Sequence, residues 1–152
     1  MSEEVIKREE TWNITYQHSI GKTASHFFNE IRGKKRLVGR YCPECDRVLM
    51  PPRRFCDRCF VDTTEWREVG EEGVIEAATI VYEQFKSLPE PPYALAYVRL
   101  DGASTAIGNY LKGIDFSNHN AAVKQIQIGN RVKVKFHENL EGSILDFWFE
   151  LV

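Results

Sequence analysis

Apolar residues recur with a helical period near the N-terminus and with a strand period after residue 70. Four of them lie at spacings i, i+3, i+4 and i+7, which is one face of an α-helix: Ala24, Phe27, Phe28 and Ile31. Gly33 stands where a left-handed residue would end that helix. Before the helix, Trp12, Ile14 and Tyr16 alternate with polar residues over positions 11–17, which predicts a short strand or an extended arm.

The second half of the chain contains five segments rich in β-branched and aromatic residues. They predict strands at residues 74–82, 93–100, 104–111, 131–137 and 144–151. A loop with three prolines, residues 87–92, separates the first two, and residues 115–128 predict a short helix between the third and fourth. Five strands with one helix after the third is the order of an OB-fold, a small Greek-key barrel.

Composition places the chain among ordinary globular proteins. It has 152 residues, of which 43% are apolar and 28% are charged. Its apolar runs are shorter than the roughly 18 residues that a membrane span needs, so we expect no membrane association. The charged N-terminus does not resemble a secretory signal, and we therefore expect a cytoplasmic protein with reduced thiols.

Charge is unevenly distributed along the chain. Residues 1–60 hold 12 Lys and Arg against 8 Asp and Glu, whereas residues 61–152 hold 8 against 14. A basic first part and an acidic second part indicate two modules with different roles. Any anion-binding site is expected in the first part.

All four cysteines fall into two pairs with the same spacing: Cys42, Cys45, Cys56 and Cys59. Two residues separate the members of each pair, so both thiolates of a pair can reach one tetrahedral ion. The connection between the pairs contains a predicted short strand, residues 48–50. This arrangement is typical of a zinc ribbon with two rubredoxin-like knuckles.

Four sulfur ligands suit zinc and iron alike. We expect zinc, because nothing else in the sequence indicates electron transfer, although a rubredoxin-like electron carrier stays an alternative. Since sulfur fills every coordination position, the ion is expected to be structural. The positions that follow the two pairs hold Asp46 and Phe60, where glycine is common.

Two motifs around the cysteines are fairly specific: RYCPEC at residues 40–45 and MPPRRFC at residues 50–56. Shorter stretches accompany them, namely SHFF at residues 25–28, Glu65, Trp66, Gly73, Pro91, Pro92, LDG at residues 100–102, Ile128 and Gly129. With these motifs the sequence, from about residue 11 to its end, resembles the DUF35-type family of zinc-ribbon and OB-fold proteins, which is associated with acyl-CoA metabolism.

The resemblance implies a mainly β fold with a short N-terminal helix. Its parts would be an arm and helix at residues 1–36, a rubredoxin-like zinc ribbon at residues 37–66 and a five-stranded OB-fold barrel at residues 67–152. It also implies a non-catalytic subunit of a thiolase-type complex. Members of this kind include the bridging protein of the archaeal thiolase and hydroxymethylglutaryl-CoA synthase assembly, partners of steroid side-chain aldolases, and the zinc-finger subunit of benzoylsuccinyl-CoA thiolase.

The chain lacks the parts for thiolase chemistry on its own, because that chemistry needs a nucleophilic cysteine assisted by histidine. All four cysteines are assigned to metal, and none of the four histidines has an evident carboxylate or cysteine partner by spacing: His18, His26, His119 and His137. We therefore predict a binding subunit that is no enzyme by itself, whose partner carries the catalytic cysteine.

Coenzyme A carries a pyrophosphate and a 3′-phosphate, so it requires Arg and Lys side chains. Residues 34–58 hold eight Lys and Arg against three Asp and Glu, and a zinc tetrathiolate would leave this patch near a charge of about +3. The predicted coenzyme A contacts are Arg53, Arg54, Lys35 and Arg36. Alternatively, these cations only balance the helix dipole and the thiolates.

Single-stranded nucleic acid is the rival ligand, since zinc ribbons and OB-folds both occur in proteins that bind it. The residues expected on the second and third barrel strands include Tyr93, Tyr97, Arg99 and Tyr110, with one cation among them. The acidic charge of this module argues against strong contacts with phosphates. The residues at 12, 14 and 16 are candidates for a partner-binding surface, or else they pack on the barrel.

Overall fold

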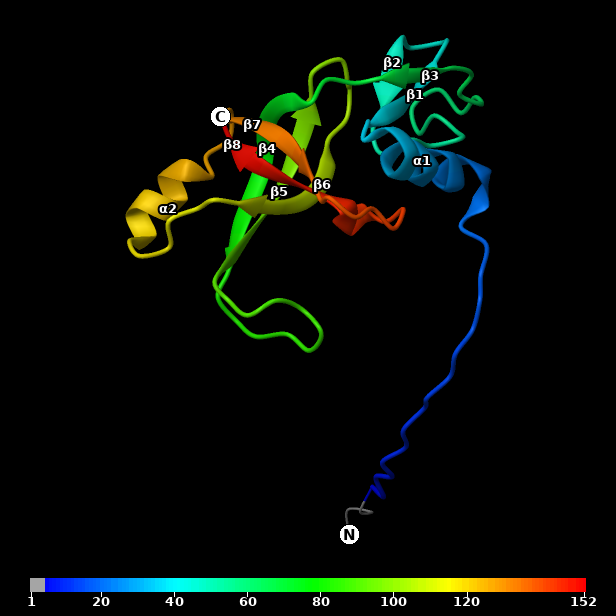
Figure 1. The fold of residues 1–152 in the computed structure, drawn as a ribbon. Coiled ribbons are helices and arrows are strands. Elements are labelled where there is room, and N and C mark those ends of the chain that lie inside the picture. Colours follow the sequence, from blue (N-terminus) through cyan, green and yellow to red (C-terminus); the bar gives the residue numbers. More distant parts are fainter. Residues whose placement is uncertain (1–4) are drawn as a thin grey trace.

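The computed structural model describes residues 5–152 and is mainly β with a helix before the first strand (Figure 1). The predicted fold class is confirmed: a helix, a three-stranded ribbon and a closed five-stranded barrel follow one another along the chain. Among the residues described, no helix has the length and apolarity that a membrane span requires.

Helix α1, Gly21–Lys34, buries Phe27 and Ile31, as its apolar spacing predicts. Its end differs from the prediction, because Gly33 is helical and Lys35 is the left-handed residue, with φ of 50°. The backbone N–H of Lys35 donates to the carbonyl of Ile31 and closes the last turn. Lys35 therefore has a left-handed backbone conformation, which glycine adopts more easily.

The ribbon is a small antiparallel sheet in the order β2-β1-β3. Its strands are β1 (Val38–Cys42), β2 (Arg47–Leu49) and β3 (Trp66–Glu68). Strand β3 lies across the predicted boundary between residues 66 and 67, because Val38 of β1 pairs with Glu68. The division of the chain into three ranges stays a prediction.

The barrel closes in the order β4-β5-β6-β8-β7, with β6 and β8 parallel. Its elements are β4 (Glu72–Val81), β5 (Tyr93–Leu100), β6 (Ile107–Lys112), α2 (His119–Gln125), β7 (Arg131–Phe136), a 3-10 turn (Ile144–Asp146) and β8 (Phe147–Leu151). This is the OB-fold that the strand and helix order predicts.

Three predicted elements are shorter than expected. The helix predicted at residues 115–128 is confined to α2, which Asn118 caps by accepting a hydrogen bond from the backbone N–H of Ala121. The last strand begins only after a 3-10 turn, where the buried Asp146 carboxylate accepts hydrogen bonds from the backbone N–H groups of Gly142 and Ser143. The third strand begins at residue 107, because the residues before it bind the ribbon.

The β5–β6 loop joins the barrel to the ribbon. The hydroxyl of Ser104 accepts a hydrogen bond from the backbone N–H of Val48 at 3.0 Å. The hydroxyl of Thr105 accepts a hydrogen bond from the backbone N–H of Met50 and donates one to the backbone carbonyl of Met50, both at 2.7 Å. These bonds satisfy the backbone of a ribbon edge strand that would otherwise lack partners.

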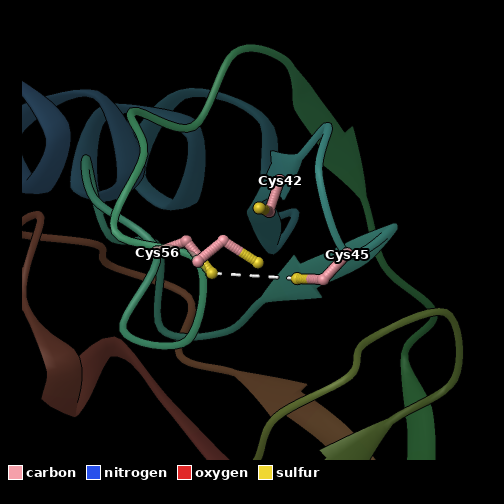
Figure 2. Close-up of side chains that lie close together, drawn as sticks. Cys42, Cys45 and Cys56 are labelled. Atoms are coloured by element: carbon pink, nitrogen blue, oxygen red, sulfur yellow. Dashed lines mark hydrogen bonds between the residues drawn. The ribbon is translucent and has the colours of Figure 1, made fainter.

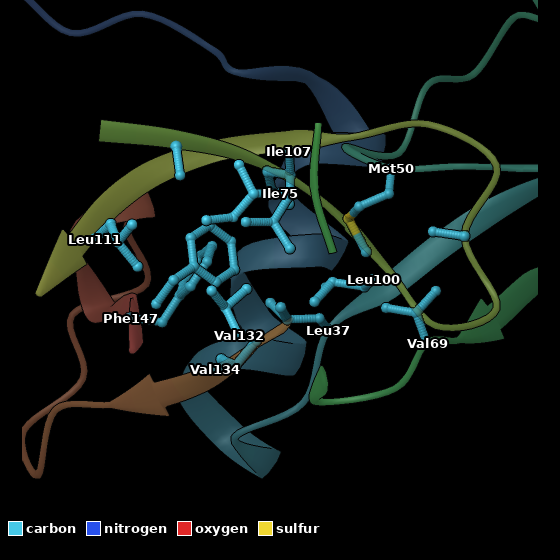
Figure 3. Packing of buried hydrophobic residues seen from close by; sticks show 14 of the residues in the cluster. Leu37, Met50, Val69, Ile75, Leu100, Ile107, Leu111, Val132, Val134 and Phe147 are labelled. Carbon is cyan, nitrogen blue, oxygen red and sulfur yellow. The ribbon is translucent and has the colours of Figure 1, made fainter. Parts of the chain in front are cut away.

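One apolar core runs through the helix, the ribbon and the barrel. Figure 3 shows Leu37 and Met50 of the ribbon segment close to barrel residues such as Leu100. Phe27 and Ile31 of α1 belong to the same cluster. The stability of the ribbon and that of the barrel are therefore linked through shared buried surface.

Gly73 marks a place where the strands of the barrel approach closely. A Cβ atom there would lie 2.5 Å from the carbonyl oxygen of Arg99 and 2.8 Å from the Cα atom of Leu100. Both atoms belong to the paired strand β5, so the backbone would have to shift. We expect Gly73→Ala to lower the free energy of unfolding by about 1–3 kcal/mol, measured by urea denaturation.

Gly33 is the matched control for that substitution. A Cβ atom at this helical position meets nothing within 4 Å. Gly33→Ala should therefore raise stability by about 0.5–1 kcal/mol, because alanine favours the helix. If both alanine variants shifted stability in the same direction, the close approach at Gly73 would not be the cause.

The N-terminal arm, residues 5–20, runs away from the folded body as an extended chain without helix or strand (Figure 1). Trp12 is 78% exposed and Tyr16 is 74% exposed. The arm therefore does not pack on its own barrel, and its apolar side chains face solvent in the isolated chain.

Candidate functional site

The four cysteines come together at one end of the ribbon. Cys42 ends β1, Cys45 follows in the β1–β2 turn, and Cys56 and Cys59 belong to the second turn. Figure 2 shows Cys42 and Cys45 facing Cys56 across a small gap. Cys42 and Cys56 are fully buried, whereas Cys45 and Cys59 are partly buried.

The separations of the four sulfur atoms fit one tetrahedral ion. All four lie within 4.8 Å of one another, and those of Cys45 and Cys56 are 3.8 Å apart. Zinc–sulfur bonds of about 2.3 Å place two ligands of a tetrahedron about 3.8 Å apart. The residues that would hold a metal ion are therefore the four predicted from spacing, and the ion would stabilise both turns of the ribbon.

The thiols differ in acidity because of their surroundings. Backbone N–H groups of Arg58 and Cys59 donate to Cys56 and lower the pKa of its thiol to about 6. The neighbouring sulfur of Cys45, together with burial, raises the pKa of Cys59 to about 12. Four thiols without a cation cannot all ionise at neutral pH, and a bound divalent ion removes that repulsion.

The residue after each cysteine pair takes the left-handed backbone conformation. Asp46 has φ of 54° and Phe60 has φ of 58°. These are the two positions where the sequence departs from the more common glycine, and the backbone geometry explains that preference. The turn geometry of a metal knuckle is thus retained with larger side chains.

A cavity of about 580 Å³ opens at one end of the barrel. Aromatic residues from three strands and from the β6–α2 loop form much of its wall: Tyr93, Tyr110, Phe116, Phe147 and Trp148. Ser87, Pro89 and Pro92 of the proline-rich loop line it as well. This volume lies within the range of small-molecule pockets, about 300–1,000 Å³.

Two polar side chains lie against the aromatic wall of this cavity. The Lys112 ammonium is 3.9 Å from the centroid of the Trp148 ring. The His137 ring lies 4.5 Å from the same tryptophan. The cavity thus combines apolar surface with a cation at its rim, an arrangement that suits an amphipathic anionic ligand.

Arg36, one of the four predicted coenzyme A contacts, lies in an ion-pair network. Its guanidinium donates to the Glu30 carboxylate and, at 2.9 Å, to Glu68. Glu30 is buried on α1, and hydrogen bonds from Arg36 and Lys34 lower its pKa. In the isolated chain Arg36 therefore compensates a buried carboxylate and joins α1 to β3.

The other three predicted contacts are exposed. Arg53 lies 3.3 Å from Asp57, and Arg54 lies 3.5 Å from Asp62. Lys35 occupies the left-handed position after α1. Of the four cations, Arg54 alone lines a groove described below, so the structure does not bring the predicted set together in one pocket.

The groove lies between the start of α1 and the ribbon and has a volume of about 910 Å³. Three cations line it, Lys22 from α1, Arg40 from β1 and Arg54 from the loop between the cysteine pairs. Trp66 of β3 also lines it. The sequence pattern did not indicate this site, although Arg40 and Trp66 both lie in stretches that carry the family resemblance.

Three histidines make contacts that spacing did not predict. His26 stacks on Trp66 with ring centroids 4.1 Å apart, and its Nε2 atom lies 3.8 Å from Glu30. The expectation that no histidine has a carboxylate neighbour is thus wrong for His26, since i and i+4 meet on a helix. His119 is hydrogen-bonded to the Tyr82 hydroxyl at 2.8 Å, and His137 lines the barrel cavity.

Sequence comparison identifies both folded parts with domains of one family. Residues 32–65 match the rubredoxin-like zinc ribbon domain of ChsH2, and residues 66–137 match the ChsH2 C-terminal OB-fold domain. Together the two matches cover an unbroken stretch of the chain. No curated protein sequence matches this chain significantly.

Solved structures share the fold at low sequence identity. A chain of the structure called "Ltp2-ChsH2(DUF35) aldolase" is 24% identical, with a TM-score of 0.65, and the match covers 89% of this chain and 98% of that one. A DUF35 family protein of unknown function from Sulfolobus solfataricus is 19% identical, with a TM-score of 0.62 and 87% of both chains covered.

Proposed function

Because this chain belongs to the DUF35 family of zinc-ribbon and OB-fold proteins, we propose that it is the non-catalytic subunit of a thiolase-type enzyme complex. In that complex it binds a thiolase-like enzyme and helps to hold coenzyme A thioesters. Its own metal is zinc, and its compartment is the cytoplasm.

The observation that carries this proposal is the likeness to the Ltp2-ChsH2(DUF35) aldolase, which extends over 98% of the matched chain. The name of that aldolase joins two components, one of which shares its family with this chain. An association with an enzyme of the same kind accounts for the exposed apolar arm, since solvent-facing aromatic residues are commonly covered by a partner.

The chemistry of the cysteines supports a non-catalytic role. A thiolase needs a free cysteine nucleophile. Here the sulfur atoms of all four cysteines lie within 4.8 Å of one another, in an arrangement that suits a metal ion. Thiolates that hold a structural metal ion are committed to that ion, so in the proposed complex the partner supplies the catalytic cysteine.

The barrel cavity is the proposed path for the acyl chain or the pantetheine arm. Its apolar walls match such a ligand, and the proline-rich loop forms part of its opening. The ribbon cations predicted from the sequence, Arg53, Arg54, Lys35 and Arg36, remain candidates for contacts with the coenzyme A phosphates in the complex.

The proposal is tested by co-purification from the native cells. Full-length tagged protein is recovered, and the proteins that accompany it in stoichiometric amount are identified by mass spectrometry. Recovery of a thiolase-fold enzyme, and binding of an acyl-CoA by the assembled complex, are expected. Recovery of nucleic acid or ribosomal components without such an enzyme would favour the single-stranded nucleic-acid alternative.

The arm offers a direct test of the partner surface. We expect Trp12→Ala and Tyr16→Ala each to remove an interface anchor and to weaken the affinity for the partner about 30-fold. Less of the partner should then be recovered with each variant. The melting temperature of the isolated chain should not change, since both side chains face solvent. Asn13→Ala and Thr15→Ala are matched controls from the polar positions of the same segment.

Equal recovery of the partner by Trp12→Ala, Tyr16→Ala and both polar controls would exclude the arm from the interface. Loss of recovery with all four variants would indicate that the path of the arm matters and its apolar side chains do not.

A further inference from the structure

We propose that the groove between α1 and the ribbon is a phosphate-binding site, whose central residue is Arg40. The inference deepens the proposed function and rests on it in one respect, namely that the phosphate-rich end of coenzyme A is the expected physiological ligand.

Arg40 carries a positive charge that no carboxylate neutralises by direct contact. Its guanidinium donates to the Thr63 hydroxyl at 2.9 Å, to the Thr64 carbonyl at 3.1 Å, and to the Thr63 carbonyl. All three acceptors are neutral. Among residues 5–152, no Asp or Glu oxygen lies within 4.0 Å of this guanidinium.

The surroundings of Arg40 favour an anionic ligand. Burial lowers the pKa of the Arg40 guanidinium, and the Asp62 carboxylate, which lies beyond direct contact, offsets this effect only in part. Other arginines of the chain, such as Arg36 and Arg131, face carboxylates directly. An anion entering the groove would supply the counter-charge that Arg40 lacks.

The side chain of Arg40 is held in place before any ligand binds. Thr63 is buried, and its hydroxyl donates to the carbonyl oxygens of Arg53 and Arg54 at 2.7 and 3.0 Å. Arg40 is thereby tied to the loop that carries Arg54. A cation that is already fixed loses little conformational entropy when an anion binds.

Trp66 fixes the other side of Arg40. The guanidinium lies 4.9 Å from the centroid of the Trp66 ring, and His26 stacks on the same ring. Lys22 and Arg54 add two cations to the groove, and Arg54 also lies 3.5 Å from the Asp62 carboxylate. Three cations around one opening match the charge of a pyrophosphate or of two phosphates on one nucleotide.

The site is tested with inorganic pyrophosphate and adenosine 3′,5′-bisphosphate as probes. Their affinity for the full-length, zinc-loaded chain is measured by isothermal titration calorimetry at low and high salt. We expect both to bind, with weaker binding at high salt because the contacts are ionic. Arg40→Gln should lower the affinity at least about tenfold, since its contact with an anion is charge-assisted.

Lys22→Gln provides a second variant that does not disturb the fold, because Lys22 is exposed and makes no ion pair among the residues described. It should lower the affinity about threefold, as expected for an exposed ionic contact. Arg32→Gln and Arg58→Gln are matched controls, because each removes an exposed cation of the same part of the chain that does not line the groove. Both controls should bind the probes as the unmodified chain does.

Several results would overturn the groove as the site. No binding of either probe would do so, and so would wild-type affinity in both Arg40→Gln and Lys22→Gln. An equal loss of affinity in the two controls would indicate a diffuse basic surface instead. Displacement of both probes by a single-stranded oligonucleotide that binds more tightly would assign the site to nucleic acid and overturn the inference as well.

The relative affinities of the probes and of coenzyme A show whether the groove binds coenzyme A or free phosphates. Tighter binding of the adenosine bisphosphate and of coenzyme A than of pyrophosphate supports a coenzyme A ligand, whereas equal affinities support a site for free phosphates. Failure of the proposed function is a separate result. In that case the purified complex binds no acyl-CoA, while the isolated chain still binds pyrophosphate in a manner that depends on Arg40.

Discussion

Replacing Cys56 with serine is expected to abolish stoichiometric metal binding and to unfold the ribbon. Cys56 is fully buried and its sulfur lies 3.8 Å from that of Cys45, so serine removes a central ligand without filling its place. Structural zinc contributes about 10–16 kcal/mol of apparent binding free energy in small zinc domains, most of which is folding free energy.

The loss should extend beyond the ribbon. Leu37, Val48 and Met50 belong to the same apolar cluster as the barrel residues, so an unfolded ribbon exposes part of the barrel core. We therefore expect a large fall in the melting temperature of the whole chain together with loss of zinc, measured by calorimetry and elemental analysis. Treating the unmodified protein with a strong chelator should produce the same state.

Asp57→Ser is the matched control for the metal site. It changes the neighbouring residue, which is exposed and pairs with Arg47 and Arg53, and leaves all four thiols in place. This variant should keep its metal and lose little stability, because exposed ion pairs contribute about 1 kcal/mol or less. If Cys56→Ser kept its full metal content and melted as Asp57→Ser does, Cys56 would not be a ligand.

Elemental analysis of the same samples also decides between zinc and iron. Four thiolates bind either ion. Zinc in a one-to-one ratio, with no visible absorption, is the expected result for a structural ribbon. Iron in that ratio would revive the electron-carrier alternative.

Replacing Phe149 with alanine should destabilise the barrel by about 3–5 kcal/mol. Phe149 is fully buried on β8 and pairs with Val134 of β7 and with Leu111 of β6, where the barrel closes. Its ring also meets Phe147 edge-on, with centroids 5.8 Å apart. Alanine would leave a cavity at the point where three strands meet.

The effect is measured by thermal and urea denaturation of the zinc-loaded protein. A loss of this size corresponds to a fall of roughly 10 °C in melting temperature for a chain of this length. Phe149→Leu keeps most of the volume and should cost less than about 1.5 kcal/mol. An equal loss in both variants would point to the aromatic contact with Phe147 and not to the cavity.

The sequence by itself was sufficient for the parts of this protein that depend on local pattern. The spacing within the two cysteine pairs predicted the metal ligands, because two intervening residues suffice to bring both thiolates of a pair to one ion. The order of five β-rich segments and one helix predicted the barrel, since few topologies connect such elements with short loops. The apolar face of α1 was equally evident from its helical period.

Local pattern was insufficient where the outcome depended on neighbours far away in the chain. Residues 104 and 105 were predicted to begin a strand, yet they bind the edge of the ribbon. Arg36 was predicted to contact coenzyme A, yet in the isolated chain it donates to Glu30 and Glu68. In both cases a hydrogen-bonding partner from another element is decisive, and spacing does not show which partner will be close.

Only the tertiary structure decided that Arg40, a cation with no carboxylate in direct contact among the residues described, faces a groove. Lys22, Arg40 and Arg54 come from a helix, a strand and a loop, and each looks like an ordinary surface cation in the sequence. The packing of α1 beside the ribbon brings them together around one opening, and the buried Thr63 holds Arg40 there. Ligand spacing within one metal knuckle is a local property, whereas this groove exists because three separate segments share one core.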